Sequence, residues 1–227
     1  MSWEERKLRL VAPLDGGDLA TVYRALEREH GGKACAVSVL HQSLDNLDAV
    51  AAKLQERVVQ ARAVSHPVKV EAEGVFTING TTALVMEYVD GKDLERIVKR
   101  EVLTGPVAAH IVAQLVELLI AAKQSDVAHG LLSPTRIRVQ PGGRVSVLGL
   151  GGKIGSGIDA DDPLFTEDRG ARRYAAPEML GGLLTSAMDV YAVGAILTYM
   201  VSGRWPKRPA KQARAHAVVA DGASMSV

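Results

Sequence analysis

Residues 127–137 read Val-Ala-His-Gly-Leu-Leu-Ser-Pro-Thr-Arg-Ile, and this stretch decides the fold. It follows residues 107–122, where apolar side chains recur at the spacing of an amphipathic helix. It runs into residues 136–148, where Pro141-Gly142-Gly143 is typical of the turn of a short hairpin. The stretch is therefore expected to form a loop that joins a helix to a hairpin.

Five further stretches accompany this loop in a fixed order along the chain. They are Leu-Asp-Gly-Gly-Asp-Leu-Ala-Thr-Val-Tyr at 14–23, Ala-Cys-Ala-Val-Ser-Val-Leu at 34–40, Leu-Val-Met-Glu-Tyr-Val-Asp-Gly at 84–91, Ala-Pro-Glu at 176–178 and Asp-Val-Tyr-Ala-Val-Gly at 189–194. With 127–137, they resemble the glycine-rich loop, third strand, hinge, activation-segment end, large helix and catalytic loop of bacterial-type Ser/Thr protein kinases. The ordered matches cover about residues 8–206, nearly the whole chain. Below, 127–137 is called the catalytic loop and 149–178 the activation segment.

Hydrophobic patterning predicts an α+β, two-lobed fold of the protein kinase type. Short apolar runs indicate five strands of an antiparallel sheet, and one apolar face indicates a single helix among them. The strands are expected at 8–14, 20–27, 34–40, 70–78 and 81–87, and the helix at 47–64. Asn79-Gly80 is the strongest turn signal for a hairpin. We therefore expect an N-terminal lobe over 1–88.

The rest of the chain is expected to form a mainly helical C-terminal lobe over 89–206. Its helices are predicted at 107–122 and 185–202, and residues 149–175 are predicted to be a long loop without periodic structure. The later helices of a kinase C-terminal lobe have no counterpart, so this lobe is expected to be shortened. Residues 207–227 form a short basic tail.

Composition excludes several classes of protein. The formal net charge of +1 gives no general attraction to nucleic acid, and the single cysteine, Cys35, excludes an internal disulfide. The N-terminus has no apolar run typical of a secretory signal. Because polar residues interrupt 107–122, we expect that helix to be too short and too polar to span a membrane. The sequence thus predicts a cytoplasmic protein.

The resemblance implies where phosphate-binding groups of a kinase would lie. The strand lysine position holds Ser38, and its usual glutamate partner aligns with Arg57, one residue after Glu56. The Asp-Phe-Gly motif, which supplies a metal ligand in the family, aligns with residues 149–151, so that Gly149 replaces the aspartate. Lys53, one helical turn before Arg57, is the only nearby lysine that could substitute.

The catalytic loop departs from the family pattern His-Arg-Asp-Leu-Lys-Pro-x-Asn in the same way. Leu131 stands at the position of the aspartate that accepts the substrate proton. Ser133 replaces the lysine, and Arg136 replaces the metal-binding asparagine. His129 is retained, and the resemblance implies that it packs beneath the activation segment. Asp189 is expected to cap the backbone amides of this loop, a structural role.

A vestigial nucleotide cleft is implied by six positions. They are Gly17, Val22, Ala36, Glu87, Val89 and Arg138. Arg138 stands where the family has a leucine below the adenine, so it is expected to turn towards solvent or towards Glu87 or Asp15. Asp159, Asp161 and Asp162 could in principle bind metal, but a solvated loop is the favoured interpretation. ATP binding is expected to be absent or weak, and no metal or other cofactor is expected.

Three functions from different classes remain open. The favoured interpretation is a catalytically inactive kinase-like protein, not an enzyme, that acts as a protein-binding scaffold or regulator, either with a protein partner or as a homo-oligomer. The alternative is a metal-independent sensor of a nucleotide or another anion, because Arg57 and Arg136 add positive charge to the cleft. The third is an atypical active protein kinase that uses displaced residues.

Overall fold

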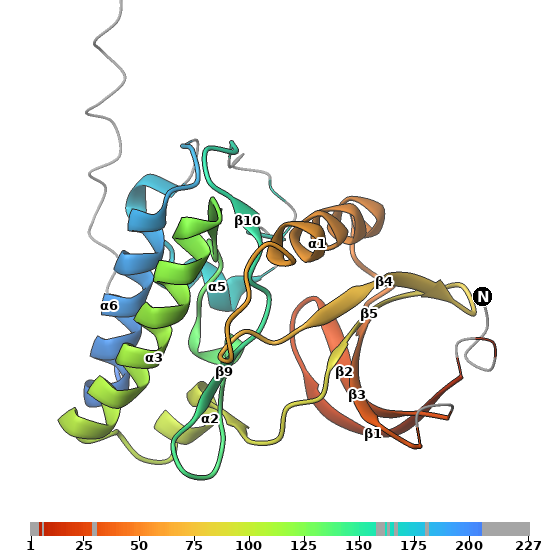
Figure 1. Ribbon diagram of the computed structural model, residues 1–227, viewed down its shortest axis with the longest axis horizontal. Coiled ribbons are helices and arrows are strands. Elements are labelled where there is room, and N and C mark those ends of the chain that lie inside the picture. Colours follow the sequence, from red (N-terminus) through yellow and green to blue (C-terminus); the bar gives the residue numbers. More distant parts are fainter. Residues whose placement is uncertain are drawn as a thin grey trace, which may run out of the picture.

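The computed structural model describes residues 5, 7–28, 31–157, 162, 164–165, 168–179 and 182–205. A curved sheet forms one end of the molecule, two long helices form the other, and one helix lies between them (Figure 1). The expected basic tail at 207–227 and residues Asp159 and Asp161 lie outside the described residues. The α+β class predicted from the sequence is confirmed.

The sheet contains the five expected strands. They are β1 (Leu8–Gly16), β2 (Ala20–Glu27), β3 (Ala34–Leu40), β4 (Ala72–Ile78) and β5 (Thr81–Glu87). All neighbours are antiparallel in the order β1-β2-β3-β5-β4. Asn79 and Gly80 both have positive φ, 50° and 73°, as a two-residue hairpin turn between β4 and β5 requires. Apolar side chains on one face, including Val37, Ile78 and Val85, form the core of this lobe.

Helix α1 (Leu47–Ala61) packs between the sheet and the helical lobe (Figure 1). It buries Val50 and Val58, and it ends three residues earlier than the sequence predicts. The reason is a buried lysine: Nζ of Lys69 donates hydrogen bonds to the carbonyl oxygens of Ala61 (2.9 Å) and Val64 (2.5 Å). Because Lys69 satisfies one carbonyl at the helix end and one in the turn that follows, the chain can leave the helix there without leaving these two groups unpaired.

The second lobe is built on α3 (Gly105–Gln124) and α6 (Ser186–Ser202), which pack side by side (Figure 1). Ile111, Leu115 and Leu118 of α3 and Ile196 of α6 lie in one core cluster. The hairpin expected at 136–148 is present as β8 (Ile137–Val139) and β9 (Val145–Val147). Short elements that the sequence did not reveal complete this lobe. They are β6 (Lys92–Asp93), α2 (Leu94–Val98), β7 (Val127–Ala128) and β10 (Gly152–Lys153).

Helix α3 is longer than predicted. It has 20 residues instead of the 16 of 107–122, and it is long and apolar enough, by length and composition, to cross a membrane. The prediction that this helix is too short and too polar to span a membrane was therefore wrong. A core helix has the same composition, and one face of α3 is buried within the second lobe.

The activation segment is more ordered than the expected loop at 149–175. Its start pairs with the strand that opens the catalytic loop, since β10 is antiparallel to β7. Its end forms α5 (Arg169–Tyr174), whose N-cap residue is Asp168. The prediction of a structureless loop was wrong for these two parts, because their pairing partners lie far away in sequence.

Candidate functional site

Asp189 fixes the backbone of the catalytic loop. From the first turn of α6, its two carboxylate oxygens accept hydrogen bonds from the amides of His129 (2.6 Å) and Gly130 (2.7 Å). The His129 ring is fully buried, and its Nε2 lies 3.0 Å from the carbonyl oxygen of Leu148. Burial, together with the charges of Arg57 and Arg136, holds the pKa of His129 well below its usual value. The predicted structural roles of Asp189 and His129 agree with this geometry.

Stability should depend on the ionisation of Asp189. Burial raises the pKa of its carboxyl from 3.8 to about 6, although the two amides act in the opposite direction. The folded state therefore binds the proton more tightly, so this contribution to stability is present at low pH and is lost between about pH 4 and 6. We expect Asp189→Asn to cost about 2 kcal/mol more at pH 4.5 than at pH 7. Urea unfolding of both proteins at both pH values measures this, and an equal cost would contradict it.

Leu131 is part of an apolar cluster. Its side chain is 6% exposed and belongs to the same cluster as Leu164 and Phe165 of the activation segment and Leu184 after it. Leu47, Ala51 and Leu54 of α1 pack against this cluster as well. In the family that the sequence resembles, this position holds an aspartate. Here it holds Leu131, an apolar side chain that joins both lobes to the activation segment.

Arg136 links the catalytic loop to the activation segment. Its Nη2 lies 2.6 Å from a carboxylate oxygen of Asp168, and both side chains are about 15% exposed. The other carboxylate oxygen of Asp168 accepts a hydrogen bond from the amide of Ala171 (2.8 Å) and so caps α5. Ser133, the other altered position in this loop, is buried with its hydroxyl 3.0 Å from that of Thr135. Arg136 thus makes a structural ion pair.

Aromatic side chains attach α5 to the end of α6. The rings of Tyr174 and Tyr199 meet edge to face with centroids 6.2 Å apart, and Trp205 stacks on Tyr199 at 4.9 Å. The guanidinium of Arg173 lies 4.4 Å from the centre of the Trp205 ring, within range of a cation–π contact. The end of the activation segment is therefore held on two sides, by Asp168 and by this aromatic group.

Arg57 joins α1 to the catalytic loop. Its Nη2 donates to the carbonyl oxygens of His129 and Gly149, both at 2.5 Å. Ser38 remains in β3, paired with Val22 on one side and Leu84 on the other. Burial, and then repulsion from Arg136, lowers the pKa of Arg57 to about 10. Sequence reasoning identified Arg57 as a replaced position, and the structure shows that it connects the two lobes through backbone oxygens.

The glycines at 149–152 permit this close approach. Gly149 and Gly151 have φ of 78° and 135°, which other residues rarely adopt. A Cβ atom on Gly151 would overlap the carbonyl oxygen of Arg57, and one on Gly152 would overlap the side chain of Leu184. The segment Gly149-Leu150-Gly151-Gly152 therefore forms a surface on which α1 packs directly.

The glycine-rich loop is tied to the second lobe. The carboxylate of Asp15 lies 3.2 Å from Nη2 of Arg96, in α2. At the tip of the loop, the amide of Gly17 donates to the carbonyl oxygen of Ala20 (2.9 Å). The sequence suggested that Asp15 could receive Arg138, so its ion pair with Arg96 is a different arrangement from the one expected.

Four of the remaining cleft positions lie on the five-stranded sheet and the hinge, and the fifth, Arg138, lies in the second lobe. Val22 and Ala36 occupy neighbouring strands β2 and β3, and Glu87 ends β5 just before Val89. The amide of Glu87 donates to the carbonyl oxygen of Glu71 (2.8 Å). Arg138 lies in β8, opposite Asp93 of β6. Near the hinge, the Arg24 guanidinium lies 5.3 Å from the centre of the Tyr88 ring.

The described residues do not fit the magnesium ions that protein kinases use. Gly149 has no side chain, and Arg136 places a cation, paired with Asp168, where a neutral ligand would be needed. In the described part of the chain, no three His, Cys, Asp or Glu side chains are grouped to hold a metal. Asp162 accepts a hydrogen bond from the amide of Leu164 (3.0 Å), as in a turn.

Sequence reasoning missed Asp168, Leu164 and Phe165, although they complete the site. For Asp168 a signal was present, because aspartate is a preferred N-cap residue; in the structure its carboxylate accepts a hydrogen bond from the amide of Ala171, three positions later. Leu164 and Phe165 stand isolated between polar residues, so no periodicity could have indicated their burial.

Comparison with known proteins agrees with this architecture. The protein kinase domain family matches residues 10–226, so the chain belongs to the protein kinase family. It is 34% identical to the serine/threonine-protein kinase PkaA of Streptomyces coelicolor, covering 88% of this chain and 39% of the relative. It is 26% identical to the probable serine/threonine-protein kinase PknB of Lactococcus lactis and to PrkC of Bacillus subtilis, each over 88% of this chain. The chain spans 31–39% of the length of these three relatives.

These relatives correct one prediction. The sequence predicted that the chain is not an enzyme, whereas relatives that match 88% of it at 26–34% identity are named as Ser/Thr protein kinases, which points to an enzyme. The replaced positions therefore do not exclude the chain from the enzyme class of its family. The resemblance to bacterial Ser/Thr protein kinases is confirmed.

Proposed function

We propose that the protein is a protein-binding regulator built on the protein kinase fold. The observation that supports this role best is an apolar stripe on the outer face of α6, opposite its buried face. Val190, Leu197 and Val201 are 68%, 37% and 44% exposed, and no charged side chain occurs between Val190 and Ser202. Contiguous exposed apolar surface of this kind is typical of interaction sites.

The neighbouring helix contributes to the same kind of surface. Val116 and Ile120 of α3 are 40% and 54% exposed, and α3 packs beside α6 (Figure 1). Covering such residues gains about 25 cal/mol for each Å² of apolar surface removed from water. A protein partner or a second copy of the chain would supply that cover.

The contacts around the catalytic loop support the same proposal. Leu131, Arg136 and Arg57 join the activation segment, the catalytic loop and α1 through protein groups. A preorganised surface loses less entropy when it binds a partner, which favours recognition. A cytoplasmic location is part of the proposal, and the burial of one face of α3 in the core supports it.

Sedimentation velocity across a wide concentration range tests self-association, and a photoreactive residue at position 197 tests contact with a partner in cells. We expect either an oligomer or one reproducible cross-linked protein. Val190→Glu should abolish whichever of the two is observed. Val59→Glu is the matched control, since Val59 is 49% exposed on α1, far from this face. A monomer at all concentrations, with no cross-linked protein, would rule out the proposed surface.

A second candidate function is the phosphorylation of Ser or Thr in proteins, which the names of the relatives favour. The test is transfer of labelled phosphate to a generic protein substrate with magnesium or manganese. Transfer above background that Lys53→Gln removes would support it, because Lys53 is the single lysine of α1 and lies one turn before Arg57. Background signal under both conditions would exclude it.

We also propose that the cleft binds ATP only weakly, at about 1 mM or above. The phosphate-binding lysine position is Ser38, and Arg138 stands where an apolar residue would support the base. We expect calorimetry to detect little binding to the natural sequence and to show tighter binding on Arg138→Leu. Micromolar affinity of the natural sequence would contradict this proposal.

A further inference from the structure

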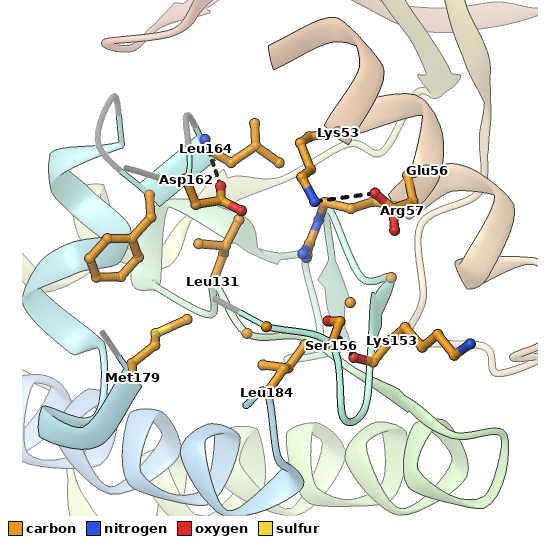
Figure 2. Close-up of a pocket in the computed structure, with 15 residues that line it drawn as sticks. Lys53, Glu56, Arg57, Leu131, Lys153, Ser156, Asp162, Leu164, Met179 and Leu184 are labelled. Atoms are coloured by element: carbon orange, nitrogen blue, oxygen red, sulfur yellow. Dashed lines mark hydrogen bonds and ion pairs between the residues drawn. The ribbon is translucent and has the colours of Figure 1, made fainter. Parts of the chain in front are cut away.

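A small pocket lies between α1 and the activation segment (Figure 2). Its polar side comes mainly from Lys53, Glu56 and Arg57 of α1, and Asp162 lies opposite. Its apolar side is formed by Leu131, Leu164, Phe165, Met179 and Leu184. The pocket therefore combines a charged wall and an apolar wall within one small space.

The apolar wall is a continuous part of the core. All five of its side chains are buried and belong to one cluster. A ligand with a short hydrocarbon chain would gain about 0.8 kcal/mol for each methylene group buried here. Leu131 is central to this wall, because an acid at its position would make the floor of the pocket polar.

The charged wall contains a cation without a carboxylate partner. The hydrogen bonds of the Arg57 guanidinium to His129 and Gly149 go to neutral carbonyl oxygens, and no carboxylate among the described residues lies within ion-pair distance of it. Burial and then the nearby Arg136 lower the pKa of Arg57, and the more distant carboxylates of Asp189, Asp162 and Glu56 offset this only in part. A negative charge beside this guanidinium would relieve both effects. The local electrostatics thus favour an anionic ligand.

Lys53 adds a second cation on the same side of α1. It lies one turn before Arg57, and both head groups extend towards the pocket in Figure 2. Its ion pair with Glu56 is long, 3.4 Å, and both side chains are about half exposed, so it is weak and easily rearranged. Three cations (Lys53, Arg57 and Lys153) and two anions (Glu56 and Asp162) line the pocket, and this small positive excess favours a monoanion over a phosphate dianion.

We propose that this pocket binds a small amphipathic monoanion, an aliphatic monocarboxylate, with its hydrocarbon chain against Leu131 and its carboxylate between Lys53 and Arg57. The proposal does not depend on the protein-binding role, because the pocket and the outer face of α6 are made of different residues. Either proposal can therefore be contradicted by experiment without affecting the other.

Hexanoate is a suitable probe, and the methyl resonances of Leu131, Met179 and Leu184 report on the pocket directly. We expect saturable shifts of these resonances with hexanoate. Acetate, which lacks the chain, and hexylammonium, which carries the opposite charge, should each bind at least about tenfold more weakly, a difference of about 1.4 kcal/mol. Equal binding of hexylammonium, or shifts confined to other parts of the molecule, would overturn the proposal.

Lys53→Gln tests the role of the charged wall without disturbing the core, since Lys53 is 44% exposed. We expect it to weaken hexanoate binding by about tenfold. The matched control is Lys99→Gln, because Lys99 is 57% exposed and pairs with Glu95 on a different helix. Unchanged affinity in Lys53→Gln, or an equal loss in both variants, would also overturn the proposal.

Discussion

Replacing Arg136 with methionine is expected to lower the free energy of unfolding by about 3 kcal/mol, because it leaves the largely buried carboxylate of Asp168 without its partner. Asp168→Asn should cost a similar amount, since it leaves the guanidinium of Arg136 unpaired close to Arg57. The asparagine keeps an oxygen that can cap α5, so the capping contribution is largely preserved.

The double variant Arg136→Met with Asp168→Asn should recover much of this loss, because neither charge then remains unpaired. Urea unfolding of the four proteins gives the coupling energy between the two side chains. Lys53→Met is the comparison for an exposed pair, since Lys53 and Glu56 are 44% and 52% exposed. It should cost less than about 1 kcal/mol. If Arg136→Met and Asp168→Asn each lowered the free energy of unfolding by no more than this comparison variant, the structural role of Arg136 would be contradicted.

Replacing Leu131 with aspartate is expected to destabilise the fold by at least about 4 kcal/mol. The change removes a buried side chain and places a carboxyl group in an apolar cluster. Leu131→Met is the control, because it keeps the volume and the apolar character, and it should cost less than about 1.5 kcal/mol. Chemical unfolding measures both variants. An aspartate variant as stable as the methionine variant would show that Leu131 is not part of a dry cluster.

Local patterns were sufficient to predict the sheet. Alternating apolar residues and Asn79-Gly80 specified the strands, and the cap that Asp189 places on the catalytic loop followed from a motif. The contacts of Arg57 could not be predicted in this way. They depend on how two distant segments approach, because its partners His129 and Gly149 are 72 and 92 residues away in sequence.

The same limit explains the activation segment. Residues 149–175 are rich in glycine and aspartate, and such composition predicts a loop. Their order comes instead from single long-range contacts, which are the strand pairing of Gly152 with Ala128, the ion pair of Asp168 with Arg136 and the burial of Phe165. None of these contacts leaves a periodic signal in the sequence.

Amide hydrogen exchange tests most directly whether protein groups alone hold the activation segment on the catalytic loop. Peptides covering 129–136 and 168–179 should be strongly protected in the protein without nucleotide, and adding ATP with magnesium should change their protection little. Arg136→Met should speed exchange in 168–179 by at least about tenfold while leaving the sheet at 72–87 unchanged. Rapid exchange of 168–179 in the natural sequence, with protection appearing only on addition of ATP and magnesium, would contradict this arrangement.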